Sequence, residues 1–243
     1  MRTLDNFSIP VTQRYVSWAD RVFNPWLSRA RSVGCSRGSA AGLIHEVEVG
    51  DVRSAISWNA DAEAFAFAHG GRRQRVFAGP WCHALASDAD VAERARFWSL
   101  LRRTPALDWM VLAGGALDNP AALPSDWGEG YDNVWVGAKM TGPESAGAAL
   151  TQLGRIPAKL RFILATPVLD DLGELDLRGI GWVIIGAEAG AAAPSLDWVM
   201  SVKLQAMYCG IPTWMENPRC AGLAGLKSVP YAVQEHPRAA LQR

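Results

Sequence analysis

This sequence of 243 residues lacks several features that identify a function directly. Its 24 basic and 24 acidic residues cancel, so overall charge gives no case for strong binding to nucleic acid or a membrane surface. No apolar run reaches the roughly 18 residues that a membrane-spanning helix needs. The first residues contain no apolar segment of the kind found in secretion signals. We therefore expect a cytoplasmic protein without a membrane partner.

Cysteine is also scarce, and no two cysteines form a CxxC pair. The four cysteines are Cys35, Cys82, Cys209 and Cys220, and their scattered positions fit a reducing compartment better than a disulfide framework. The sequence contains no Walker loop, GxGxxG, HExxH or GxSxG motif. These absences remove the usual signatures of nucleotide, dinucleotide, zinc-protease and serine-hydrolase sites.

What the chain does contain is enough apolar sequence for a core, at 49% of residues, and eleven tryptophans. Most tryptophans are expected in that core. Trp18, Trp26 and Trp58 stand in polar or irregular surroundings, so we expect them to be candidates for lining a cleft.

Short apolar runs alternate with helical patterns from residue 76 onward, which indicates βα units and a parallel sheet. The expected strands cover residues 76–78, 109–113, 134–138, 160–165, 182–185 and 211–214. The expected helices cover 89–103, 145–154 and 196–208, with Asp88 and Ser195 as N-caps. Six such strands predict an α/β fold of one domain, 1–243, built as an open or partial (β/α) barrel.

Within that domain, residues 1–75 form an irregular N-terminal cap and first βα unit, 76–218 the barrel core, and 219–243 a surface tail. Residues 22–30 are compatible with a loop or an amphipathic helix, and 62–69 are helix-prone. The arginines of this region are either solvated or form a phosphate-binding patch; they are Arg29, Arg31, Arg37, Arg72, Arg73 and Arg75.

The clearest strand, residues 182–185, ends in the sequence Gly-Ala-Glu-Ala-Gly, which exposes Glu188 between small residues. The binding sites of parallel sheets and barrels lie at this carboxyl edge of the strands. Glu188 is therefore either a site carboxylate or the cap of the following helix.

Other polar residues also follow expected strand ends, so they are expected to gather at the same edge. Acid–base catalysis is assigned to Glu188, Lys139, Glu216 and His83, whose pKa values burial would have to shift toward neutrality. Substrate binding is assigned to Trp81, Asp118, Thr166, Asn217 and Arg37.

Three alternatives stay open at this edge. Cys82 and His83 resemble a nucleophile and its base, yet neighbouring strand residues point to opposite sides of a sheet. A single metal ion bound by Cys82 and His83, together with Glu188 and Glu216, is a second alternative. Lys139 is either a Schiff-base amine or a solvated residue at a strand end.

Four motifs occur in order along the chain: Asn133 to Ala138 (NVWVGA), Arg161 to Leu169 (RFILATPVL), Trp182 to Gly190 (WVIIGAEAG) and Gly210 to Asn217 (GIPTWMEN). They resemble N-V-W-L-G-V-S, R-F-L-S-x-E-P-L, W-V-I-V-G-G-E-S-G and G-V-P-F-F-x-K-Q-W-G. These are the motifs of a phage-associated radical-SAM-like family that carries a three-cysteine cluster motif. The resemblance implies a partial barrel of the radical-SAM type, with an iron–sulfur cluster and SAM as cofactors.

This sequence departs from that family where the cluster binds. Asn24-Pro25-Trp26 and Gly34-Cys35 match the opening motif, but residues 36–39 (SRGS) supply none of the further cysteines. One thiolate cannot hold a four-iron cluster with an open site for SAM. The family's T-K-R-P and K-Q-W-G stand here as AGGA at 113–116 and MENP at 215–218.

The sequence therefore predicts a cluster-less, radical-SAM-like pseudoenzyme or a replaced chemistry, with no cofactor assigned. The leading expectation is a phage-type protein that binds, and modifies without radicals, a nucleotide or nucleic-acid base. A catalytically inactive barrel serving a protein partner as subunit or scaffold is the alternative. A radical SAM enzyme with an unconventional cluster site is a second alternative.

Overall fold

The computed structural model describes residues 17–25, 50–78, 85, 90–113, 122–186, 193–216 and 237, with only the backbone of Glu216. The strands are β1 (Arg21–Phe23), β2 (Gln74–Ala78), β3 (Leu107–Leu112), β4 (Val134–Lys139), β5 (Leu160–Ala165), β6 (Trp182–Gly186) and β7 (Thr213–Glu216). The helices are α1 (Val52–Ala60), α2 (Ala62–Ala68), α3 (Val91–Arg103), α4 (Pro143–Arg155) and α5 (Leu196–Tyr208). None of these helices is long and apolar enough to cross a membrane.

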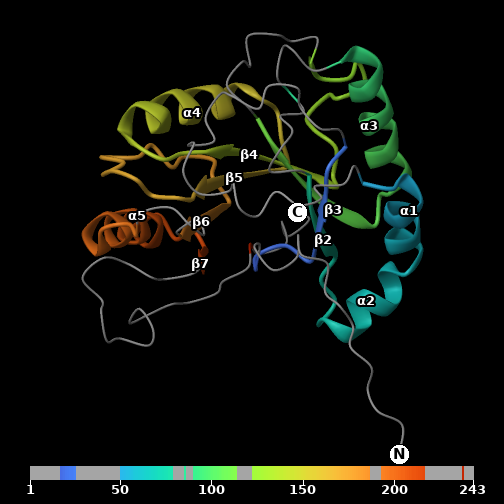
Figure 1. The fold of residues 1–243 in the computed structure, drawn as a ribbon, viewed down its shortest axis with the longest axis horizontal. Helices are drawn as coiled ribbons and strands as arrows, with labels where there is room; N and C mark the ends of the chain where they lie inside the picture. The colour runs from blue at the N-terminus through green and yellow to red at the C-terminus, as the bar shows by residue number, and fades with distance from the viewer. Residues whose placement is uncertain are drawn as a thin grey trace, which may run out of the picture.

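The seven strands form one sheet in sequence order, and each strand pairs in parallel with the next. Parallel neighbours need a crossover, and the right-handed crossover places each connecting helix on the same side of the sheet. The sheet is curled into a half-barrel, with α1, α2 and α3 beside its first strands and α4 and α5 beside its last (Figure 1). The fold class is therefore α/β with a partial parallel barrel.

Alternate residues of each strand contribute to two different apolar clusters, as the two-residue period of a strand requires. In β3, Trp109 and Val111 belong to the cluster between the sheet and the helices. The alternate residues Met110 and Leu112 belong to a second cluster on the concave face of the half-barrel. Both faces are thus buried, which explains why the strands read as continuous apolar runs.

Aromatic rings fill the middle of the concave face. The ring of Trp182 makes edge-on contacts with Trp18, Trp135 and Trp214 at centroid distances of 6.4, 6.1 and 6.4 Å. Trp18 also packs edge-on against Phe77 at 4.6 Å. Such edge-to-face pairs stabilise a core beyond the area they bury.

One strand, β5, and one helix, α5, have the bounds that the sequence predicts. Asp90, rather than Asp88, is the N-cap of α3, because its carboxylate accepts the backbone N–H groups of Ala92 and Glu93. Ser195 is the N-cap residue of α5 but makes no side-chain capping hydrogen bond. The last strand begins at Thr213, two residues later than predicted.

The N-terminal region contains the main corrections. The sheet has a seventh strand, β1, where the sequence indicated a loop or helix; three residues are too few for a periodic pattern, and pairing with β2 defines them. Trp18 is not a cleft residue, since only 2% of it is exposed. Trp58 is half-buried with the Arg21 guanidinium 5.5 Å from its ring centroid, and Trp26 lies outside the described residues.

Candidate functional site

The carboxyl ends of all seven strands meet at one edge of the half-barrel, because every strand pair is parallel. Of the predicted site residues, Lys139, Thr166 and the backbone of Glu216 lie in the described part of the chain, and all three are at this edge. The others lie outside the described residues: Arg37, Trp81, Cys82, His83, Asp118, Glu188 and Asn217.

The strand register brings Lys139 and Glu216 to this edge with an offset of two residues along the strands. Lys139 pairs with Leu164, and Leu164 pairs with Ile184 in the next strand. Glu216 pairs with Gly186, two residues further along that same strand. Three strand spacings of about 4.8 Å and an offset of about 6.6 Å along the strands separate the two backbones, so they stand on the order of 16 Å apart. That width suits a ligand the size of a nucleotide.

Lys139 is half-buried and belongs to the concave face, because it follows the concave residue Trp135 by two strand repeats. Between them, Gly137 leaves space for the fully buried ring of Phe162, which lies over its backbone. The aromatic layer therefore forms a floor, and Lys139 stands at the strand end beyond it.

The segment that follows β5 joins the ends of its neighbours on both sides. Thr166 is half-buried directly after the strand. The backbone N–H of Val168 donates to Gly186 in β6 at 3.2 Å, and that of Leu169 donates to Thr141 after β4 at 2.9 Å. The edge from β4 to β6 is therefore one continuous backbone surface, which sequence patterns did not indicate.

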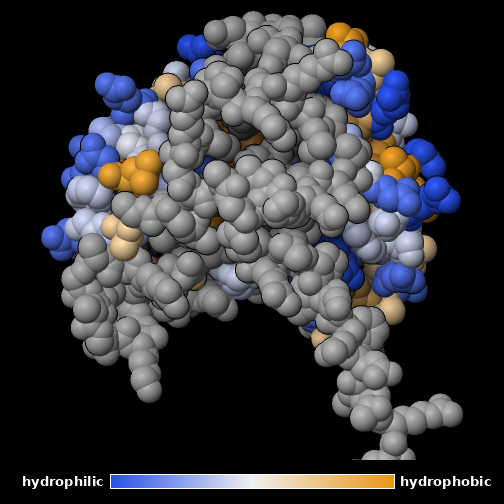
Figure 2. Space-filling view, in the orientation of Figure 1, coloured by the Kyte–Doolittle hydropathy of each residue, from blue (hydrophilic) through white to orange (hydrophobic). Residues whose placement is uncertain are grey.

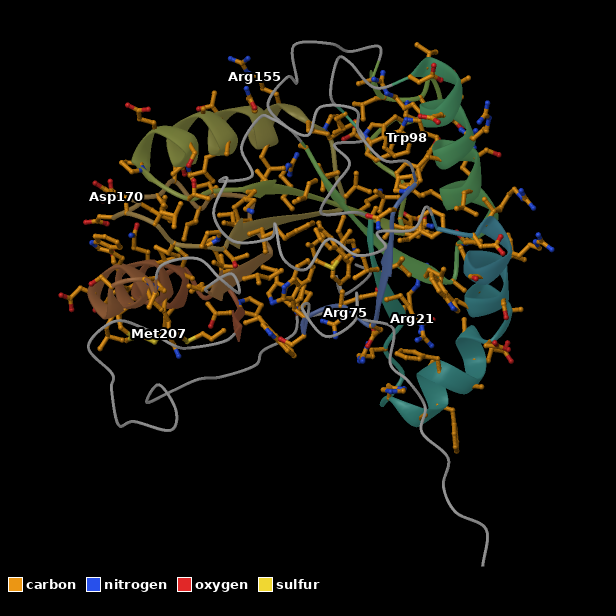
Figure 3. All side chains as sticks on the ribbon, viewed as in Figure 1. Arg21, Arg75, Trp98, Arg155, Asp170 and Met207 are labelled. Atoms are coloured by element: carbon orange, nitrogen blue, oxygen red, sulfur yellow. The ribbon has the colours of Figure 1, made fainter. Side chains whose placement is uncertain are left out.

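Arg72, Arg73 and Arg75, which were expected to be solvated or to bind phosphate, form ion pairs within the fold. Arg72 makes a bidentate pair with Asp20, at 2.7 and 2.8 Å, and Arg73 lies 3.3 Å from Asp108. Arg75 is buried, with its guanidinium 5.4 Å from the ring centroid of Trp182 (Figure 3). These three arginines lie at the amino ends of the strands, opposite the candidate site, and they are neutralised largely by the two aspartates. Arg29, Arg31 and Arg37 lie outside the described residues.

Burial sets the titration of this charged cluster. Burial raises the pKa of Asp108 to about 6, against the opposing charges of Arg73 and Arg75. Burial also opposes the ionisation of Asp20, yet hydrogen bonds from Arg72 and from the Arg75 backbone prevail and hold its pKa below the usual value. For Arg75, burial lowers the pKa to about 10, so it remains a cation at neutral pH.

Sequence patterns missed the roles of Asp20 and Asp108. The available signal was a charged residue inside an otherwise apolar strand, as in Leu107-Asp108-Trp109 and Arg75-Val76-Phe77. Such a residue needs a partner of opposite charge, because an unpaired buried charge is costly.

The described residues contain no group of three or more histidine, cysteine, aspartate or glutamate side chains that could hold a metal ion. Cys209, the one described cysteine, caps the carboxyl end of α5 and is exposed. Because α5 runs back from the end of β6 to the start of β7, Cys209 lies at the sheet edge opposite Lys139. It is therefore not placed to ligate a cluster at the candidate site.

Residues 13–217 match the model of a family described as "Protein of unknown function (DUF5131)", and the chain belongs to that family. The match covers the whole described sheet and stops just after β7. No curated protein and no solved structure matches the chain.

Proposed function

We propose that this protein is a divergent, cluster-less radical-SAM-like barrel that binds a nucleotide or nucleic-acid base at the carboxyl edge of its sheet. We propose further that it modifies this ligand by non-radical acid–base chemistry, and that it is phage-encoded, as the sequence resemblance implies. The observation that carries the proposal is the register that aligns Lys139, Thr166 and Glu216 along one continuous edge above an aromatic floor.

The chemistry of these residues supports an anionic, planar ligand. The Lys139 ammonium group is a point charge suited to a phosphate, and Thr166 offers a hydroxyl beside it. Glu188, Glu216 and His83 are the groups that we assign to proton transfer at the base. The buried aromatic floor gives this edge a rigid apolar base.

The donor set of the chain does not fit the iron–sulfur cluster that the resemblance implies. Cys35 is the only cysteine of the expected loop, and Cys209 lies at the wrong edge of the sheet. We therefore assign no step to SAM or to a cluster. Metal and sulfide analysis of protein purified without oxygen tests this part, since iron and sulfide in cluster stoichiometry would restore the radical SAM alternative with an unconventional site.

Calorimetric titration with a panel of ribonucleoside and deoxyribonucleoside monophosphates and short single strands tests the binding. We expect at least one of them to bind, and Lys139→Met to weaken that binding at least about tenfold, the loss of one charge-assisted contact. Lys159→Met is the matched control, because Lys159 is an exposed lysine before β5, at the opposite edge, where it pairs with Asp132 at 3.5 Å. Equal losses in both variants, or no binding to the whole panel, would contradict the proposal.

Modification of the ligand needs its own measurement. Incubation followed by mass spectrometry of the nucleotide should show a mass change that Glu188→Gln or Glu216→Gln abolishes while binding persists.

A catalytically inactive scaffold is the second candidate, and the packing of the concave face favours it. The described concave face is occupied by the protein's own aromatic side chains, as in a structural core. Two results together would select this second function. The protein would bind the ligand without changing its mass, and Glu188→Gln would keep the activity of the original protein in its host cell.

A further inference from the structure

The outer face of α4 has an unusual composition for an exposed helix surface. We define the α4 face as six of its exposed residues, Glu144, Gly147, Ala148, Thr151, Gly154 and Arg155. Its middle carries only small side chains, and its two ends carry opposite charges. Figure 2 shows mainly pale and blue residues on the visible part of α4, so this surface is not a hydrophobic patch.

Among the described residues, none packs closely against the two glycines of the α4 face. A Cβ atom added to Gly147 or Gly154 would meet nothing within 4 Å. Glycine within a helix is less favourable than alanine, so a position with free space has no internal reason to keep it. An external reason is close approach by the backbone of another helix, which small residues allow.

An open groove runs beside this face. It has a volume of about 750 Å³ and lies between Gly147, Thr151 and Gly154 on α4 and the segment from Leu172 to Arg178. A groove of this kind along a helix can receive a second helix, in the way amphipathic helices bind in grooves.

The charges of the α4 face are arranged to match a second copy of the same face. Glu144 and Arg155 are 11 residues apart, which is about 1,100° of helical rotation, so they lie within roughly 20° of one line along the helix. Their separation along the axis is about 16.5 Å. Asp170 adds negative charge at the Glu144 end, since its Cβ lies 3.7 Å from a Cβ placed on Gly142, the N-cap of α4. Figure 3 shows Arg155 and Asp170 near opposite ends of the helix.

A two-fold axis that crosses the α4 face at the level midway between residues 149 and 150 therefore places each Glu144 opposite an Arg155 of the other copy. We propose that the α4 face is a homodimer interface, in which two copies of the chain pack their α4 helices antiparallel. The Glu144–Arg155 pair forms twice by symmetry, as an isologous contact requires. The small residues at the centre let the helices approach, and the acidic end of one helix faces the basic end of the other.

Sedimentation equilibrium of the full chain tests the assembly. At concentrations from about 1 to 100 µM, we expect a concentration-dependent mass that reaches twice the 26.3 kDa of the monomer. Raised salt should weaken the dimer, because its end contacts are exposed ion pairs. A protein that stays monomeric over this range would overturn the proposal. Binding of a different protein to the α4 face of such a monomer would overturn it too.

Charge reversal tests whether these residues form the contact. Glu144→Lys and Arg155→Glu should each raise the dimer dissociation constant at least about tenfold, because each creates two repulsive contacts. The double variant restores opposite charges across the axis, so its constant should return to within about threefold of the original. A dimer that neither single variant weakens would assign the interface elsewhere and overturn the proposal.

A third variant separates interface effects from folding effects. Gly147→Gln should stabilise the isolated helix by its higher propensity, yet it should weaken the dimer by blocking close approach. Ala95→Gln, at an exposed position of α3, is the control and should leave the dimer unchanged. Circular dichroism verifies that both variants fold; equal dimerisation in Gly147→Gln and the original would contradict the packing proposed here.

Discussion

Trp214 donates its indole N–H to the hydroxyl of Ser17 at 3.0 Å, a contact between residues 197 positions apart. Ser17 precedes the first strand, and Trp214 is in the last one. The next residue, Trp18, inserts its ring between Phe77 of β2 and Trp182 of β6. The segment before β1 thus connects the two ends of the sheet across the concave face.

Removal of the Trp18 ring should therefore be among the costliest single changes. We expect Trp18→Ala to lower the free energy of unfolding by about 3–5 kcal/mol, the range for large-to-alanine changes in a core. Ser17→Ala, which removes the hydroxyl that accepts a hydrogen bond from Trp214, should cost about 1 kcal/mol. Urea unfolding followed by circular dichroism measures both; comparable losses would show that Trp18 packs less tightly than its contacts indicate.

The Asp20 carboxylate holds this segment to the sheet through charge. Asp20→Asn should lower the free energy of unfolding by about 3 kcal/mol, because it removes the bidentate ion pair with Arg72 and the ion pair with the buried guanidinium of Arg75. Asp126→Asn is the control, since the pair of Asp126 with Arg102 is exposed and should contribute little. The same urea experiment compares them, and a small loss in Asp20→Asn would mean that solvent reaches Arg75.

The space around two glycines predicts that alanine will change the stability in opposite directions at Gly137 and Gly147. A Cβ added to Gly137 would stand 2.3–2.5 Å from three ring atoms of Phe162. Because that ring is fully buried, we expect Gly137→Ala to cost about 2–3 kcal/mol. Gly147→Ala, in open space on α4, should instead stabilise the dilute, monomeric protein by about 0.5–1 kcal/mol. Melting curves of the two variants should shift in opposite directions.

Asp108 predicts a pH dependence of stability. Its pKa rises from 3.8 to about 6 on folding, so the folded protein binds the proton more tightly than the unfolded chain. The protonated form is therefore favoured by folding, and stability falls by up to about 3 kcal/mol as pH rises from about 4 to 6. Asp108→Asn cannot ionise, so its stability relative to the original should improve across this range. Urea titrations at pH 4.5 and 7 measure the difference, and a pH-independent difference would contradict this origin.

The local sequence specified most of the sheet. Continuous apolar runs such as 182–185 define their strands without help from the rest of the chain, because both sheet faces are buried there and every position must be apolar. The alternation of these runs with helical patterns then required parallel strands, and parallel strands required that Lys139, Thr166 and Glu216 share one edge.

Only the tertiary structure decided the first strand and the partners of the charged residues. Arg21–Phe23 is too short for a periodic pattern, and it becomes a strand because β2 supplies its hydrogen bonds. The sequence indicated that Arg72 and Arg75 are either solvated or part of a phosphate-binding patch, but Asp20 lies more than 50 positions away in sequence and beside them in space. A sequence states which residues carry charge; the fold determines which charges meet, because Coulomb attraction depends on distance in space and not along the chain.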